Sequence, residues 1–157
     1  MDLEALALAV DERIRVPAAE RGSGRLYAVR SGPEAGSAGV TLQLLAEGEA
    51  RTLPQRVRLP DGVDAIALTS GVWVAPMGED GPDRPPSQHP ERRRAHLTVL
   101  VGTDDGLDGV DVSVLRYGDG APTVLRGGVG LIHQRMLRCW SRRPEAPWAT
   151  ARSKPAA

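Results

Sequence analysis

The pattern of hydrophobic and polar positions predicts a helix near each end of the chain. Over residues 2–15, aliphatic side chains recur at helical spacing, and Pro17 ends the pattern. The stripe consists of Leu3, Leu6, Ala7, Val10 and Ile14. Residues 130–142 (GLIHQRMLRCWSR) repeat this periodicity, with arginines in the last turn, where the helix dipole favours cations. The narrow stripe of the first helix is typical of a core face or a dimer face.

Hydrophobic runs between the two helices predict strands. Residues 25–30 and 40–46 fit the two arms of a hairpin across a turn rich in Gly and Pro. Residues 63–77 are the most hydrophobic run, which fits one long strand with a bulge at Gly71 or a hairpin turning at Ser70–Gly71. We favour the bulged strand, because two-residue turns prefer Asn-Gly or Asp-Gly and the arms of that hairpin would be very short.

Three further strands are predicted in the second half. Residues 95–102 and 109–117 fit a hairpin whose loop, TDDGLDG, contains two Asp-Gly steps. Residues 121–126 fit a short strand at the edge of the sheet.

Two stretches predict loops. Pro54 and Pro60 exclude a long helix or a central strand over residues 47–62, where we expect at most a short edge strand over 55–59. Residues 78–94 (GEDGPDRPPSQHPERRR) contain proline, glycine and charge and no hydrophobic residue. A loop this long inside a compact domain is usually functional or disordered.

The order of these elements predicts an α+β fold. We expect a mostly antiparallel sheet of about five strands, with the N-terminal and C-terminal helices packed on it. A chain of 157 residues fits one domain, which we expect to span residues 1–143 and to be followed by a disordered tail over 144–157.

Composition excludes several classes of chemistry. The chain has 20 basic residues, of which only Lys154 is a lysine, so it has no internal lysine for a Schiff-base enzyme or a phosphate-loop NTPase. Its single cysteine, Cys139, excludes an internal disulfide and a cysteine-based zinc site. The first residues, MDLEALALAV, carry acids where a signal peptide needs basic residues, and no run approaches the ~20 hydrophobic residues of a membrane span. We therefore expect a soluble cytoplasmic protein without membrane contact.

The charge balances overall and is uneven along the chain. The zero net charge argues against a generic nucleic-acid-binding protein. Residues 1–80 hold 8 arginines and 12 acidic residues (net −4), and residues 81–157 hold 12 basic and 8 acidic residues (net +4). The two halves either attract each other or a second copy, or are simply solvated surface.

The string RPPSQHPERRR, residues 84–94, is the most specific in the sequence. Its serine, histidine and arginines suit hydrogen bonding to a ligand that carries phosphate or carboxylate. With the neighbouring strands, the candidate ligand-binding residues are Trp73, Ser87, His89, Arg92, Arg94 and His96. Alternation along a strand places Arg92 and Arg94 on one face and Arg93 on the other, which weakens a three-arginine patch. The alternative is a rigid crossover with solvated charges.

The same segment carries a family resemblance. A strand with a central tryptophan, a Pro-Ser-x-x-Pro-x-Arg loop and a further strand resemble a family of uncharacterised bacterial (actinobacterial) and phage proteins. The matching residues are Trp73, Pro86, Ser87, Pro90 and Arg92, within roughly residues 63–102. The family has no assigned activity, so the resemblance implies an architecture and no chemistry.

The sequence contains few signs of a catalytic or metal-binding motif. His89 and His96 are seven residues apart, which is longer than the usual zinc spacing of three to five, so we expect no metal and no cofactor. The chain has no Gly-x-Ser-x-Gly and no His-Glu-x-x-His, and an enzyme built on Ser87, His89 and His96 is the weakest hypothesis.

We therefore expect a non-catalytic binding module that self-associates or binds a protein partner. Contact would use a sheet edge or the first helix, with the 78–94 loop as the variable element. The alternative is a nucleic-acid or anion-binding accessory protein using the basic C-terminal half, where Arg135, Arg138 and Arg142 fall at helical neighbour spacing.

Overall fold

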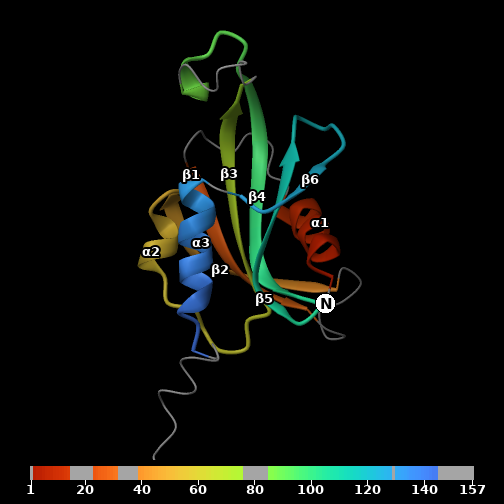
Figure 1. Ribbon diagram of the computed structural model, residues 1–157, viewed down its shortest axis with the longest axis vertical. Helices are drawn as coiled ribbons and strands as arrows, with labels where there is room; N and C mark the ends of the chain where they lie inside the picture. The colour runs from red at the N-terminus through yellow and green to blue at the C-terminus, as the bar shows by residue number, and fades with distance from the viewer. Residues whose placement is uncertain (1, 15–22, 32–38, 76–84, 129, 145–157) are drawn as a thin grey trace, which may run out of the picture.

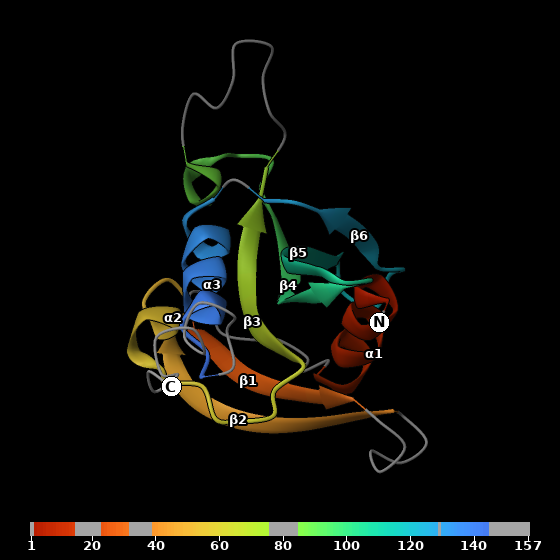
Figure 2. The ribbon, with the colours of Figure 1, turned by 60° about the horizontal axis from the view of Figure 1, so that its bottom comes forward.

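In the computed structural model the chain forms a sheet with helices on both faces (Figures 1 and 2). The structure describes residues 2–14, 23–31, 39–75, 85–128 and 130–144. The strands are β1 (Ser23–Ser31), β2 (Val40–Glu49), β3 (Ala65–Val74), β4 (Arg93–Asp104), β5 (Leu107–Arg116) and β6 (Thr123–Arg126). The helices are α1 (Leu3–Ile14), α2 (Leu53–Arg56) and α3 (Leu131–Ser141), with a 3₁₀ turn, η2 (Pro86–Gln88), before β4.

The sheet has six strands in the order β2-β1-β3-β4-β5-β6, and every neighbouring pair is antiparallel. This confirms the predicted α+β class, with one strand more than the five or so expected. The predicted hairpins of the first and second halves are the β1–β2 and β4–β5 pairs. Residues 145–157 of the predicted tail, 76–77 at the end of the predicted strand and 78–84 of the predicted long loop lie outside the described residues.

The bulge predicted at Gly71 is wrong. The register of β3 with β4 runs unbroken from Ala65 opposite Gly102 to Val74 opposite Arg93. His96 stands directly opposite Gly71, so no extra residue is inserted there. The β4–β5 turn is shorter than the predicted loop. It uses the first Asp-Gly step alone, where Asp105 (φ 46°) and Gly106 (φ 85°) adopt the positive φ of a type I′ turn.

The segment 47–62, predicted as a loop with at most a short edge strand over 55–59, contains the one-turn helix α2. Pro54 lies in the first turn of this helix, where a missing backbone N–H leaves no hydrogen bond unmade. The turn buries Leu53 and Pro54.

The core has two layers, one on each face of the sheet. The hydrophobic stripe of α1 is buried on one face against residues such as Ala67, Leu100 and Val112, so it is a core face and not a dimer face. On the other face α3, beside α2, covers residues such as Ile66 and Val99. Coverage of both faces explains why β3 begins as a continuous hydrophobic run.

The β4–β5 turn holds the start of α1. The Asp104 carboxylate accepts the Leu3 N–H (3.1 Å) and a hydrogen bond from Arg126 (2.8 Å), which also donates to Glu4 (2.6 Å). The Leu3 N–H foremost, and then Arg126, keep the pKa of Asp104 below its ordinary value.

The same turn holds the end of α3. The Asp108 carboxylate accepts the Trp140 indole N–H (2.9 Å), and Nη2 of Arg143 lies 3.0 Å from each of its oxygens. Desolvation alone would raise the pKa of Asp108. The hydrogen bonds from Trp140, Thr103 and Arg143 outweigh it, so the pKa is lowered. Two of the three acids of TDDGLDG, Asp104 and Asp108, thus hold the ends of helices in place.

Candidate functional site

The C-terminal end of β3 and the N-terminal end of β4 extend together beyond the rest of the sheet (upper part of Figure 1). Pairing of β1 with β3 ends at Ser70, and pairing of β5 with β4 ends at His96, while β3 and β4 stay paired as far as Val74 and Arg93. We call residues 71–74 and 93–95, with the preceding 85–92, the ribbon. It contains most of the candidate residues predicted from the sequence.

Three consecutive arginines of the ribbon stack on aromatic rings. The Arg92 and Arg94 guanidinium carbons lie 4.9 Å and 5.9 Å from the centre of the Trp73 ring. The Arg93 guanidinium lies 4.3 Å from the centre of the Tyr117 ring. Trp73 stands opposite Arg94 in register, so both share one sheet face and Arg93 takes the other, as the alternation predicted.

Arg92 and Arg93 differ from several other arginines in whether they pair with a carboxylate. Within the described part of the chain, neither Arg92 nor Arg93 forms an ion pair with a carboxylate. Four arginines elsewhere do form such pairs: Arg25 with Glu47, Arg116 with Asp11, Arg126 with Glu4 and Asp104, and Arg143 with Asp108. A guanidinium stacked on a ring keeps its N–H edges available for a carboxylate or phosphate.

His89 makes the hydrogen bonds of the turn that precedes Arg92. Its ring Nδ1 accepts the Glu91 N–H (3.0 Å), and its carbonyl accepts both the backbone N–H and Nη1 of Arg92 (3.2 Å each). The backbone of Ser87 lies in η2, and its side chain is outside the described part. No hydrogen bond or ion pair among the described side chains joins His89 to His96, so the weak enzyme hypothesis gains no support.

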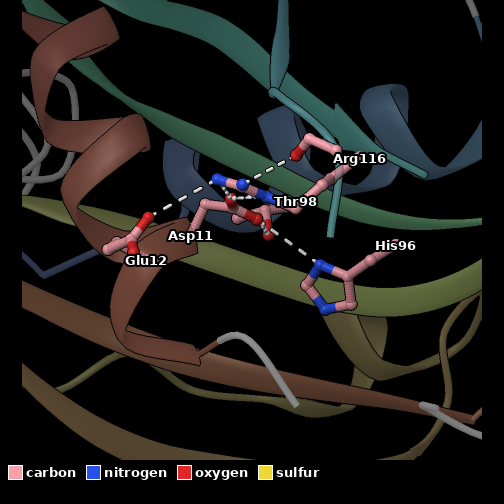
Figure 3. Close-up of polar contacts among 6 residues, drawn as sticks. Asp11, Glu12, His96, Thr98 and Arg116 are labelled. Carbon is pink, nitrogen blue, oxygen red and sulfur yellow. Dashed lines mark hydrogen bonds and ion pairs between the residues drawn. The ribbon is translucent and has the colours of Figure 1, made fainter. Parts of the chain in front are cut away.

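His96 belongs to a second, buried group of polar side chains (Figure 3). Asp11 of α1 is 0% exposed, and its carboxylate accepts hydrogen bonds from Nε (3.1 Å) and Nη2 (2.9 Å) of Arg116. Thr98 Oγ1 donates to the other oxygen (3.2 Å), and Nδ1 of His96 lies 3.4 Å from that same oxygen. The group joins α1 to β4 and β5 just below the ribbon on the same sheet face.

These contacts set the ionisation of Asp11. Burial acts to raise the pKa of its carboxyl, but the nearby His96 and the hydrogen bonds and charge of Arg116 lower the pKa further than burial raises it. The carboxylate is thus held in its charged form as a structural counter-ion for Arg116. Arg116 also donates to the Gly120 carbonyl (2.9 Å).

Sequence reasoning missed Asp11 and Arg116. Asp11 lies at helical spacing from Ala7 and Ile14, on the buried stripe of α1. A carboxylate on an otherwise hydrophobic stripe was the available signal for a buried partner, although it does not say which residue that partner is.

We expect the protein to lose stability in acid. Asp11, Asp104 and Asp108 all have a pKa below the ordinary 3.8. A carboxylate whose pKa is lower in the folded state stabilises fully above its unfolded pKa, and this stabilisation is lost as the pH falls through the folded value. Urea denaturation at a series of pH values should give a steady free energy of unfolding down to about pH 5 and a fall below about pH 4. Asp108→Asn should show a shallower fall. Constant or rising stability between about pH 5 and 3 would contradict this.

Two general features of the described residues bear on the class of site. They contain no group of three or more His, Cys, Asp or Glu side chains placed to hold a metal ion. None of their helices combines the length and hydrophobicity needed to cross a membrane.

Comparison of the chain with known proteins found no matching family model, no matching curated protein and no matching solved structure. The resemblance to the bacterial and phage family therefore stays a prediction.

Proposed function

We propose that the chain is a non-catalytic binding module that contacts an acidic segment of a partner protein through the ribbon. The observation that carries the proposal is the stack of Arg92 and Arg94 on Trp73. An arginine held against a ring loses less conformational entropy when it binds, because its fork of N–H groups is already oriented. Bidentate contact with a carboxylate is the interaction that such a fork favours.

Binding is favoured over catalysis by where the reactive side chains lie. Asp11 is buried, and its carboxylate accepts hydrogen bonds from Arg116 and Thr98, with His96 3.4 Å away. His89 uses Nδ1 within its own turn. A general base needs a substrate proton within hydrogen-bond reach, and these groups are occupied in holding the fold.

A carboxylate suits the stack better than a nucleobase does. Single-stranded nucleic acids bind by stacking their bases on exposed aromatic rings. Two guanidinium groups already contact the Trp73 ring, so a base would have to displace one of them. A carboxylate instead binds at the guanidinium edges and leaves the stack intact.

The test is binding of poly-L-glutamate, followed by fluorescence anisotropy. Arg92→Ala should weaken binding about tenfold, because a charge-assisted pair of hydrogen bonds is lost. Trp73→Leu keeps the net charge and should weaken binding roughly threefold, because a cation–π contact is worth about 0.5–1 kcal/mol at an exposed site. Arg25→Ala, a matched removal of one exposed arginine on β1, should have little effect.

Three outcomes would count against the proposal. The wild-type protein could fail to bind poly-L-glutamate, or Arg25→Ala could weaken binding as much as Arg92→Ala does. A dimer in sedimentation velocity that Arg92→Ala dissociates would assign the ribbon to a second copy in place of an acidic partner.

A further inference from the structure

A second basic surface lies on α2 and α3, away from the ribbon. The sequence of residues 50–60 and 131–142 contains no aspartate and no glutamate. Its arginines are Arg51, Arg56, Arg58, Arg135, Arg138 and Arg142, which we call the arginine surface. All of them are exposed except Arg135, which is partly exposed.

The fold brings these two segments together. α2 lies beside α3 in both views (Figures 1 and 2). Arg135 donates to the Arg51 carbonyl (2.5 Å), and Arg142 donates to the Pro54 carbonyl (2.9 Å). Each bond uses one N–H group and restrains a guanidinium at the junction of the two segments, although a guanidinium has five such groups.

Acidic residues lie at the margins of this surface. Glu49 and Asp61 flank the first segment in the sequence, and the Asp111 carboxylate lies 3.0 Å from Nδ1 of His133 on α3. Asp108, which accepts a hydrogen bond from Trp140 near the end of α3, forms an ion pair with Arg143. The zero net charge of the chain thus does not describe these two segments, which hold six arginines and no acidic residue.

We propose that the arginine surface binds the phosphate backbone of a nucleic acid. Arg135 and Arg138 of α3 and Arg142, which caps its end, follow one another at about 4.5 Å and about 6 Å of helix axis. Double-stranded DNA carries one charge per about 1.7 Å, so several of these arginines can face phosphates at once. Contacts to phosphates carry no sequence information, so we expect binding without sequence preference.

The hydrophobic side chains of this face argue against a lipid surface. A helix that adsorbs to a membrane exposes hydrophobic residues between its basic ones. Leu53, Met136 and Trp140 instead point into the core, and Leu131, at the start of α3, is the exposed large hydrophobic residue of these described helices. Anionic lipid is therefore the less favoured polyanion.

The test is binding to a labelled DNA duplex of about 20 base pairs at rising salt, followed by anisotropy. Each phosphate contact contributes about 0.9 to the slope of log Kobs against log salt, so six arginines give a slope no steeper than about −5. Arg56→Ala/Arg138→Ala should weaken binding about tenfold or more at low salt and reduce the slope by about two. These two side chains are chosen because Arg135 and Arg142 also hold α2 to α3.

The matched control is Arg92→Ala/Arg94→Ala, which removes the same charge from the ribbon and should leave DNA binding nearly unchanged. A failure to bind DNA would not bear on the ribbon proposal, because that proposal is tested by binding of poly-L-glutamate. Absence of wild-type binding at about 50 mM salt, or an equal loss in the ribbon control, would overturn the inference. So would competition by poly-L-glutamate as strong as that of unlabelled DNA, or binding to phosphatidylserine vesicles without binding to DNA.

Discussion

Replacing Asp11 with alanine should destabilise the protein by about 3–5 kcal/mol, because Arg116 would be left as a buried charge without its counter-ion. Arg116 is 6% exposed and donates two hydrogen bonds to the Asp11 carboxylate. Breaking one side of a buried ion pair costs far more than breaking an exposed one, since the remaining charge cannot be solvated. Urea denaturation followed by circular dichroism measures the change in free energy of unfolding.

Glu12→Ala is the matched control. Glu12 is the next residue on α1 and also approaches Arg116 (3.5 Å), but its side chain is 69% exposed, so we expect a loss below about 1 kcal/mol. The double variant Asp11→Leu/Arg116→Met should recover much of the stability lost in Asp11→Leu, because hydrophobic residues can replace a whole buried pair. A loss in Asp11→Ala no larger than in Glu12→Ala would show that the buried group does not stabilise the fold.

Trp140→Ala should cost about 3–5 kcal/mol, the usual effect of removing a large aromatic side chain from a core. Trp140 is 3% exposed, packs in the core layer under α3 and donates its indole N–H to Asp108. The Arg143 guanidinium lies 4.1 Å from the centre of its ring, so the substitution also removes the surface on which Arg143 rests. Thermal and urea denaturation would both report the loss.

Two control variants test whether the loss comes from core packing at Trp140. Trp140→Phe keeps most of the packing and loses the hydrogen bond to Asp108, so we expect a loss of roughly 1–2 kcal/mol. Trp73→Leu alters a ribbon tryptophan outside the core layers and should cost less than about 1 kcal/mol. Equal losses in Trp140→Ala and Trp73→Leu would contradict the placement of the two tryptophans.

Much of this fold could be predicted from periodicity. The stripe of α1 and the strands of the two hairpins follow from spacings of 3.6 and 2, which reflect geometry within a single element. The bulge at Gly71 could not be judged in this way, because a bulge is a property of two strands and the register of β4 was unknown. α2 was missed because Pro54 was interpreted as a helix breaker, although proline suits a first turn.

The candidate site shows the same division between local and long-range information. Alternation along β4 predicted the opposite faces of Arg93 and Arg94, which is a local property. The stack of Arg92 on Trp73 depends on the register across a long hairpin, which no local pattern fixes. The pairing of Asp11 with Arg116 joins residues 105 positions apart. The stripe of α1 could therefore indicate that Asp11 has a buried partner, but it could not identify that partner as Arg116.

The type I′ turn at Asp105–Gly106 has a practical consequence for engineering the chain. It is exposed and rich in Asp and Gly, so on sequence alone it would be a natural place to insert a tag or a label. Asp104 on one side fastens the start of α1, however, and Asp108 on the other fastens the end of α3. An insertion here would loosen the first and last helices together, and labels are better placed elsewhere.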